Sequence, residues 1–104
     1  MLIRDLSELE LFTSREITQV NEDKETHPYL VECLRRFYTG DFGALEEEDI
    51  RANLTELREG EGHVLARYEK KHNLRNDIYV EAIFSESRPG GDFNKCLVMY
   101  VDER

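Results

Sequence analysis

The chain of 104 residues has little of what small proteins use to cross-link themselves or to enter a membrane. Its two cysteines, Cys33 and Cys96, are far apart and form no CxxC or Cys/His cluster, so neither a disulfide framework nor a structural zinc site is indicated. No apolar run approaches the roughly 20 residues of a membrane span, and residues 1–5 lack the pattern of a signal peptide. We therefore expect a cytoplasmic protein with buried, reduced thiols and no membrane contact.

Basic residues are also scarce. The sequence has 14 Lys and Arg against 23 Asp and Glu, a net charge of −9. Residues 41–62 hold eight acids and two bases, whereas residues 63–104 hold seven of each. Because an acidic surface repels phosphates, we expect no direct nucleic-acid binding. A basic protein surface, such as that of a nucleic-acid-binding enzyme, is the better electrostatic match for a partner.

The usual catalytic signatures are missing as well. No Ser or Cys lies in a nucleophile elbow, and His27, His63 and His72 share no metal-ligand spacing. We therefore predict no catalytic residues, no metal site and no cofactor.

What the chain does contain is an apolar pattern with two different periods. After residues 21–27, which read as a loop, Pro28 suits the first turn of a helix that ends at Gly40. This helix places five apolar residues on one face: Leu30, Cys33, Leu34, Phe37 and Tyr38.

A tight turn, Gly40-Asp41-Phe42-Gly43, then reverses the chain, and an acidic run begins the next helix. The acids of this run, Glu46, Glu47, Glu48 and Asp49, offset the positive end of the helix dipole. Ile50, Leu54 and Leu57 give the second helix its apolar stripe, and Gly60 and Gly62 close it.

From residue 63 the period changes to that of strands. Residues 63–69, 78–84 and 96–101 each predict a strand, with a turn at 70–77 and a long, mobile loop at 85–95. Residues 78–84 are apolar on both faces, which predicts a central strand. The last three residues are expected in solvent.

The beginning of the chain, residues 1–20, is less clearly patterned. Residues 1–16 suit a helix or an arm, and residues 17–20 favour a short edge strand. The length fits one domain, residues 1–104. We predict an α+β fold in which two or three helices pack on one face of a three-stranded antiparallel sheet, with that edge strand as an extra element.

The motif GDFG at residues 40–43, followed by Glu48-Asp49, Asn53, Leu57, Gly60 and Tyr68, resembles a family of small uncharacterised proteins encoded on plasmids, prophages and other mobile elements. The family pattern is GDWG, then ED, then Asn four residues on, and the match covers about residues 28–84. Phe42 stands where the family has Trp, and the Thr, Glu and Arg run that usually follows is not cleanly present at residues 85–88. The resemblance implies a mobile-element setting in a bacterial cytoplasm and no established activity.

Residues at the turn and the second helix are the candidate binding residues: Asp41, Glu46, Glu47, Glu48, Asp49 and Asn53. Asp41, Asp49 and Asn53 converge on the turn if it folds as predicted, where they could bind a cation. The structural alternative weighs more: Asp41 accepts backbone N–H groups, Asp49 lies in a helix start, and Asn53 bonds loop carbonyls.

These observations favour a small acidic, non-enzymatic protein that binds a host or element-encoded protein; inhibition of a nuclease by mimicry of DNA phosphates is one version. One alternative is a metal-dependent hydrolase or nuclease that uses Asp41, Asp49 and Glu69. Another is a homodimeric structural module that pairs through residues 96–101, if that strand lies at a sheet edge.

Overall fold

The structure is a computed structural model that describes residues 6, 9–59, 61–85 and 94–104. Within these residues the predicted α+β class is confirmed. The strands are β1 (Glu10–Thr13), β2 (Glu61–Tyr68), β3 (Ile78–Ser85) and β4 (Lys95–Tyr100); the helices are α1 (Arg15–Val20), α2 (Thr26–Tyr38) and α3 (Glu47–Glu59), with a 3-10 turn, η2 (Val101–Glu103).

The sheet has the order β1-β4-β3-β2. The three predicted strands are confirmed as β2, β3 and β4, which pair antiparallel. The prediction of a central strand is also confirmed, because β3 pairs with β2 on one side and with β4 on the other. Its residues Ile78, Val80 and Ala82 are fully buried in the core.

The fourth strand, β1, corrects the prediction for the beginning of the chain. Residues 10–13 form an edge strand parallel to β4, and residues 17–20, predicted as a strand, lie in α1. The reason is local: Ser14 ends β1 by donating its backbone N–H to Val98, and its hydroxyl accepts the N–H of Ile17 as the helix N-cap. A good cap and the burial of Ile17 outweigh the β-propensity of the segment.

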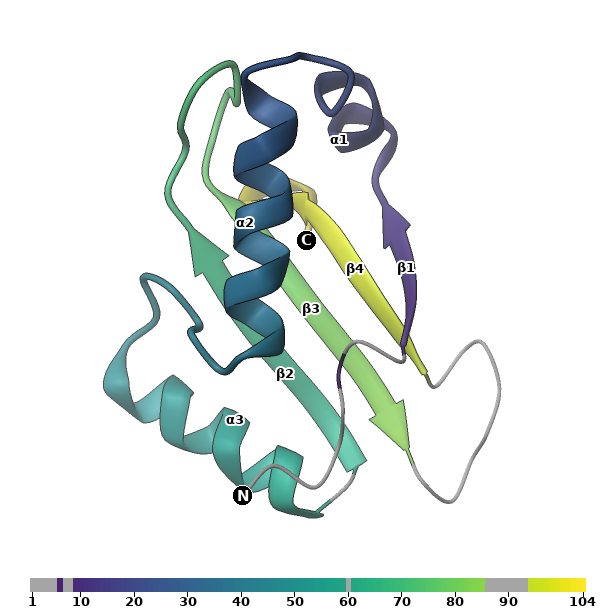
Figure 1. Ribbon diagram of the computed structural model, residues 1–104. Helices are drawn as coiled ribbons and strands as arrows, with labels where there is room; N and C mark the ends of the chain where they lie inside the picture. Colours follow the sequence, from purple (N-terminus) through teal and green to yellow (C-terminus); the bar gives the residue numbers. More distant parts are fainter. Residues whose placement is uncertain (1–5, 7–8, 60, 86–93) are drawn as a thin grey trace.

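Helix α2 lies across one face of the sheet (Figure 1). The predicted apolar face is confirmed, since Leu30, Cys33 and Phe37 are buried. Pro28 lies in the first turn as predicted, although the helix begins two residues earlier, at Thr26. Asp23 fixes this start, because one of its carboxylate oxygens accepts both the backbone N–H and the hydroxyl of Thr26, at 2.8 and 2.7 Å.

Helix α3 lies beside β2, at the end of the sheet opposite to β1 (Figure 1). The predicted sequence of helix, turn and acidic helix start is therefore confirmed. Of the two glycines predicted to close this helix, Gly60 lies outside the described residues, and Gly62 lies in β2. Both cysteines are free and buried, as expected, and burial raises the pKa of the Cys96 thiol to about 12.

The last three residues, 102–104, are exposed to solvent, as predicted, although Glu103 and Arg104 also make contacts with the rest of the chain. Glu103 of η2 accepts the backbone N–H of Tyr100, the last residue of β4, and Arg104 donates to Glu81 on β3 at 2.9 Å. Most of the loop predicted at 85–95, residues 86–93, lies outside the described residues. Among the described residues, none of the helices has the length and apolar character that crossing a membrane requires.

Candidate functional site

The predicted turn at residues 40–43 is built around Asp41. Arg36, from the end of α2, donates two hydrogen bonds to the Asp41 carboxylate, at 2.7 and 3.2 Å, and the backbone N–H of Gly43 donates a third. The Arg36 guanidinium therefore holds the pKa of Asp41 below its ordinary value. The structural role predicted for Asp41, acceptance of a backbone N–H in the turn, is confirmed.

The same turn closes the free edge of β2. The backbone N–H of Ala44 donates to the carbonyl of Arg67 at 2.8 Å, and the N–H of Arg67 donates to the carbonyl of Phe42 at 3.2 Å. Gly43 has a φ of 71°, and a Cβ atom there would lie 2.1 Å from the Arg67 carbonyl oxygen. Glycine is required at this position because the backbone comes too close to β2 for any side chain.

Asn53 closes the next part of the same edge. Its side-chain amide donates to the carbonyl of Leu65 at 2.7 Å and accepts the N–H of Leu65 at 3.1 Å. An amide side chain carries the same donor and acceptor as a peptide group, so Asn53 takes the place of a neighbouring strand. Asn53 is only 5% exposed. Its partner is thus a strand and not, as predicted, the carbonyls of a loop.

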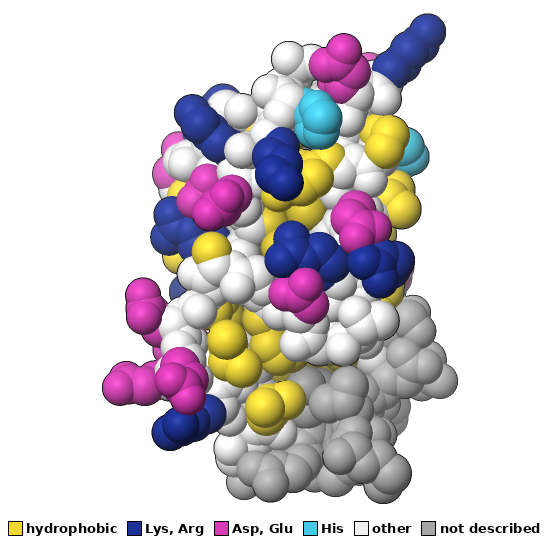
Figure 2. Space-filling model, turned by 60° about the vertical axis from the view of Figure 1, so that its left-hand side comes forward, with side chains coloured by type: hydrophobic (Ala, Val, Ile, Leu, Met, Phe, Trp, Pro, Cys, Tyr) yellow, Lys and Arg dark blue, Asp and Glu magenta, His cyan; other side chains and the backbone are white. Residues whose placement is uncertain are grey.

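The start of α3 carries four consecutive acids, and all four side chains are exposed. We call this group, which is distinct from the turn at residues 40–43, the acidic turn: Glu46, Glu47, Glu48 and Asp49. Glu47 forms an ion pair with Arg51, and the side chains of the other three make no hydrogen bond or ion pair in the described part of the chain. Figure 2 shows acidic side chains at the lower left of one face, next to hydrophobic ones.

The carboxylates of the acidic turn are arranged around the start of α3 in a ring, and not in a row along one face. Successive helical residues are about 100° apart, so Glu47, Glu48 and Asp49 point in three directions around the start of α3. Their charges offset the helix dipole, as predicted. A row of carboxylates along one face, which phosphate mimicry requires, does not arise from consecutive residues of a helix.

The candidate carboxylates are not gathered at one point. Asp41 binds Arg36, Asp49 is exposed at the start of α3, and Glu69 is exposed just after β2. No group of three His, Cys, Asp or Glu residues that could hold a metal ion occurs within residues 6, 9–59, 61–85 and 94–104. Similarly, β4 does not offer the free edge that the homodimer hypothesis assumed, because β1 and β3 pair with its two sides.

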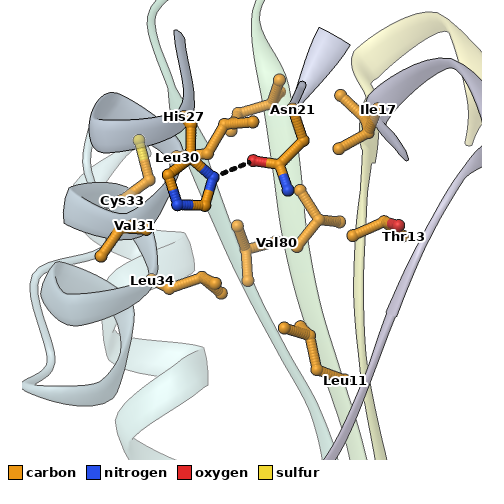
Figure 3. Close-up of a pocket in the computed structure, with 12 residues that line it drawn as sticks. Leu11, Thr13, Ile17, Asn21, His27, Leu30, Val31, Cys33, Leu34 and Val80 are labelled. Carbon is orange, nitrogen blue, oxygen red and sulfur yellow. Dashed lines mark hydrogen bonds between the residues drawn. The ribbon is translucent and has the colours of Figure 1, made fainter. Parts of the chain in front are cut away.

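A second site, which sequence reasoning missed, lies between α2 and the sheet. It is an apolar pocket of about 190 Å³ whose walls come from β1, α1, α2, β3 and β4 (Figure 3). The lining residues are Leu11, Thr13, Ile17, Asn21, His27, Leu30, Val31, Cys33, Leu34, Ile78, Val80 and Val98.

The rim of this apolar pocket carries one polar pair. Nδ1 of His27 and Oδ1 of Asn21 are 2.8 Å apart and joined by a hydrogen bond (Figure 3).

The wall of the pocket that α2 supplies could be predicted from the helical period of its apolar residues. The opposite wall could not be predicted, because it depends on residues 10–13 forming a strand beside β4, a pairing between segments near opposite ends of the chain.

Comparison with known proteins found no relative of this chain. No protein-family model matches the chain, and no curated protein or solved structure matches it either. The resemblance to the mobile-element family therefore stays a prediction.

Proposed function

We propose that the chain is a small acidic, non-enzymatic binding protein that docks onto a basic surface of another protein through the acidic turn. One observation carries the proposal: the side chains of Glu46, Glu48 and Asp49 are exposed and make no ion pair or hydrogen bond in the described part of the chain. Their neighbours Asp41 and Asn53, in contrast, hold the fold together. A binding role therefore falls to the acidic turn.

The surface next to the acidic turn supports this assignment. Leu54, two turns into α3, is 41% exposed, and Ile50, one turn before it, is half-buried. An apolar centre with charged residues around it is the arrangement of a typical protein interface. The proposed partner surface is accordingly basic at its rim with an apolar residue that covers Leu54.

The biological setting follows from the resemblance and is part of the same proposal. If the chain belongs to a mobile element, its partner is a host or element-encoded protein, and a nucleic-acid-processing enzyme supplies a suitable basic surface. Because the acids form a ring, we propose recognition of a compact basic patch and not occupation of a DNA groove.

A charge-reversal experiment tests the proposal. The probe is an amphipathic peptide of alternating Leu and Arg residues, titrated into the labelled protein and followed by NMR. We expect saturable shifts centred on residues 46–54 and an affinity that falls with added salt. The triple variant Glu46→Lys, Glu47→Lys, Glu48→Lys should abolish these shifts.

The matched control is Glu22→Lys with Glu25→Lys, which changes acids that lie outside the proposed surface. This variant should bind as the wild type does. Binding that does not respond to salt, or that the control weakens as much as the triple variant, contradicts the assignment to the acidic turn. Pull-down with the same variants, followed by a salt titration, extends the test to natural partners.

A further inference from the structure

We propose that the apolar pocket between α2 and the sheet is a binding site for a small aromatic molecule that carries one hydroxyl or amide group. The site is separate from the acidic turn, and the proposal does not depend on the function proposed above. It comes from the size of the pocket, the chemistry of its lining and the polar pair at its rim.

Size is the first argument. The pocket measures about 190 Å³. Close-packed cores leave few voids larger than a water molecule, and an engineered apolar cavity of roughly 150 Å³ takes up benzene. The pocket therefore has room for a six-membered ring with one or two substituents.

The lining is the second argument. Val80 and Val98 form the floor on the sheet, while Leu30 and Leu34 of α2 form one wall. The opposite wall comes from β1, where Leu11 is 43% exposed although it borders the pocket. Water in such a site finds few partners, so an apolar ligand that displaces it gains free energy.

The polar pair at the rim is the third argument, because it specifies a hydrogen-bonding group. The amide oxygen of Asn21 can only accept, so Nδ1 of His27 carries the proton in their hydrogen bond. In the neutral imidazole Nε2 is then an acceptor, and Nδ2 of Asn21 remains a donor. Neither nitrogen has a partner in the described residues.

The rim thus presents one donor and one acceptor next to an apolar cavity (Figure 3). The lone pair of Nε2 points away from the Nδ1–H bond, so one ligand group cannot reach both nitrogens; a hydroxyl or amide oxygen can accept from Nδ2 of Asn21. Phenols and aromatic amides are therefore the ligand class that the pocket fits.

Phenol and toluene make a matched pair of probes, since they have the same number of non-hydrogen atoms and differ in one group. We expect both to give saturable NMR shifts at the methyl groups of Leu30, Leu34, Val80 and Val98. Phenol should bind about tenfold more tightly, which corresponds to one neutral hydrogen bond, to Nδ2 of Asn21. Intermolecular NOEs from the ring to Val80 and Val98 should place it in the pocket.

Two pairs of variants separate the apolar and polar arguments. Leu34→Phe should fill part of the pocket and weaken both probes at least tenfold, whereas Leu34→Met conserves volume and should change little. Asn21→Leu should remove the preference for phenol and leave toluene binding intact. Its control is Gln19→Leu, an exposed residue of α1 that does not line the pocket.

Several results would overturn the proposal. The absence of saturable shifts for both probes, or NOEs to residues elsewhere, excludes the pocket as a site. Equal affinity of phenol and toluene for the wild type removes the polar part of the ligand class. If Leu34→Phe fails to fold, as circular dichroism would show, the NOEs and the Asn21→Leu comparison still decide the question.

Discussion

The two edge strands of the sheet, β2 and β1, differ in what covers their outer sides. The edge of β2 is closed: the turn at residues 42–44 bonds both backbone groups of Arg67, and Asn53 bonds both backbone groups of Leu65. At the other end, β1 pairs only with β4 among the described residues, and its side chains Leu11 and Phe12 are each 43% exposed. One edge is closed by a turn and the side chain of Asn53, while the other borders an apolar pocket.

This difference separates structural residues from those available for binding. An unpaired strand edge invites contact with another chain, and proteins protect such edges with covering elements or charges. At β2, the residues with the most distinctive motif, Asp41, Gly43 and Asn53, serve this protection. Motif residues thus need not mark a site of chemistry. The groups left available to partners are the acidic turn on the outside of α3 and the apolar pocket beside β1.

The largest effect is expected at Gly43. Gly43→Ala places a Cβ atom 2.1 Å from the Arg67 carbonyl oxygen at a φ of 71°, so the turn must leave β2. We expect a loss of about 3–5 kcal/mol in the free energy of unfolding, from steric overlap and backbone strain together. Gly40→Ala is the control, because no atom lies within 4 Å of its added Cβ and only the strain of its φ of 91° applies, about 1 kcal/mol. Equal losses in urea denaturation would show that the turn does not touch the edge.

Asn53 comes next. Asn53→Leu keeps the approximate volume but leaves the N–H and C=O of Leu65 without partners, which should cost about 2–4 kcal/mol. Thr55→Ala is the comparison on the same helix, where an exposed hydroxyl bonds the carbonyl of Arg51, and its cost should stay below about 0.5 kcal/mol. Hydrogen exchange should also accelerate at Leu65 in the Asn53 variant. An unchanged exchange rate would mean that Asn53 does not protect the edge.

A smaller effect is expected where the closed edge meets the core. Tyr68 is fully buried, and its hydroxyl donates to the carbonyl of Asp41 at 2.7 Å. Tyr68→Phe should therefore cost about 1–2 kcal/mol. Tyr38→Phe, at a half-buried tyrosine of α2 whose hydroxyl has no hydrogen bond in the described residues, should be close to neutral. Thermal unfolding of the two variants measures this difference. If Tyr38→Phe lowered the melting temperature more than Tyr68→Phe, the result would contradict the hydrogen bond of Tyr68.

The ion pair of Asp41 and Arg36 predicts a weak pH dependence. The pKa of Asp41 is lower in the folded than in the unfolded chain, so its contribution is fully present above the ordinary value near 3.8 and is lost as the pH falls through the folded value. Because the Asp41 side chain is 52% exposed, solvent screening limits the contribution to less than about 1 kcal/mol. Asp41→Asn should flatten the stability curve below about pH 4 and leave it parallel to wild type above about pH 5. A steeper curve in the variant would reverse the assigned sign.

The smallest effect is expected at the open edge. Phe12→Lys should change the free energy of unfolding by less than about 0.5 kcal/mol, because the side chain is already 43% exposed on an edge strand. A lysine there should also lower self-association, since charges on an edge disfavour strand pairing between chains. Light scattering of wild type and variant measures this. If Phe12→Lys lowered the free energy of unfolding as much as Asn53→Leu does, the β1 edge would be covered, and the contrast between the two edges would disappear.

Much of the fold could be predicted from the sequence because the signals were local. The apolar face of α2, the acidic start of α3 and the alternation in β2 each follow from a few neighbouring residues. The segment before residue 21 was predicted wrongly, since Ile17 and Val20 favour a strand and the Ser14 cap favours a helix. Pairing of β1 with β4 decided between them, and no local pattern indicates a parallel pairing between segments so far apart.

The sequence by itself determined where the chain turns, which helix faces are apolar, and that negative charge accumulates around residues 41–62, because these properties depend only on neighbours along the chain. Only the tertiary structure decided that Asn53 replaces a strand, that Asp41 is paired with Arg36, and that β1 and α2 enclose a pocket. The physical reason is that a polar or apolar side chain has no fixed role until folding supplies the partner it faces, and those partners come from distant parts of the chain.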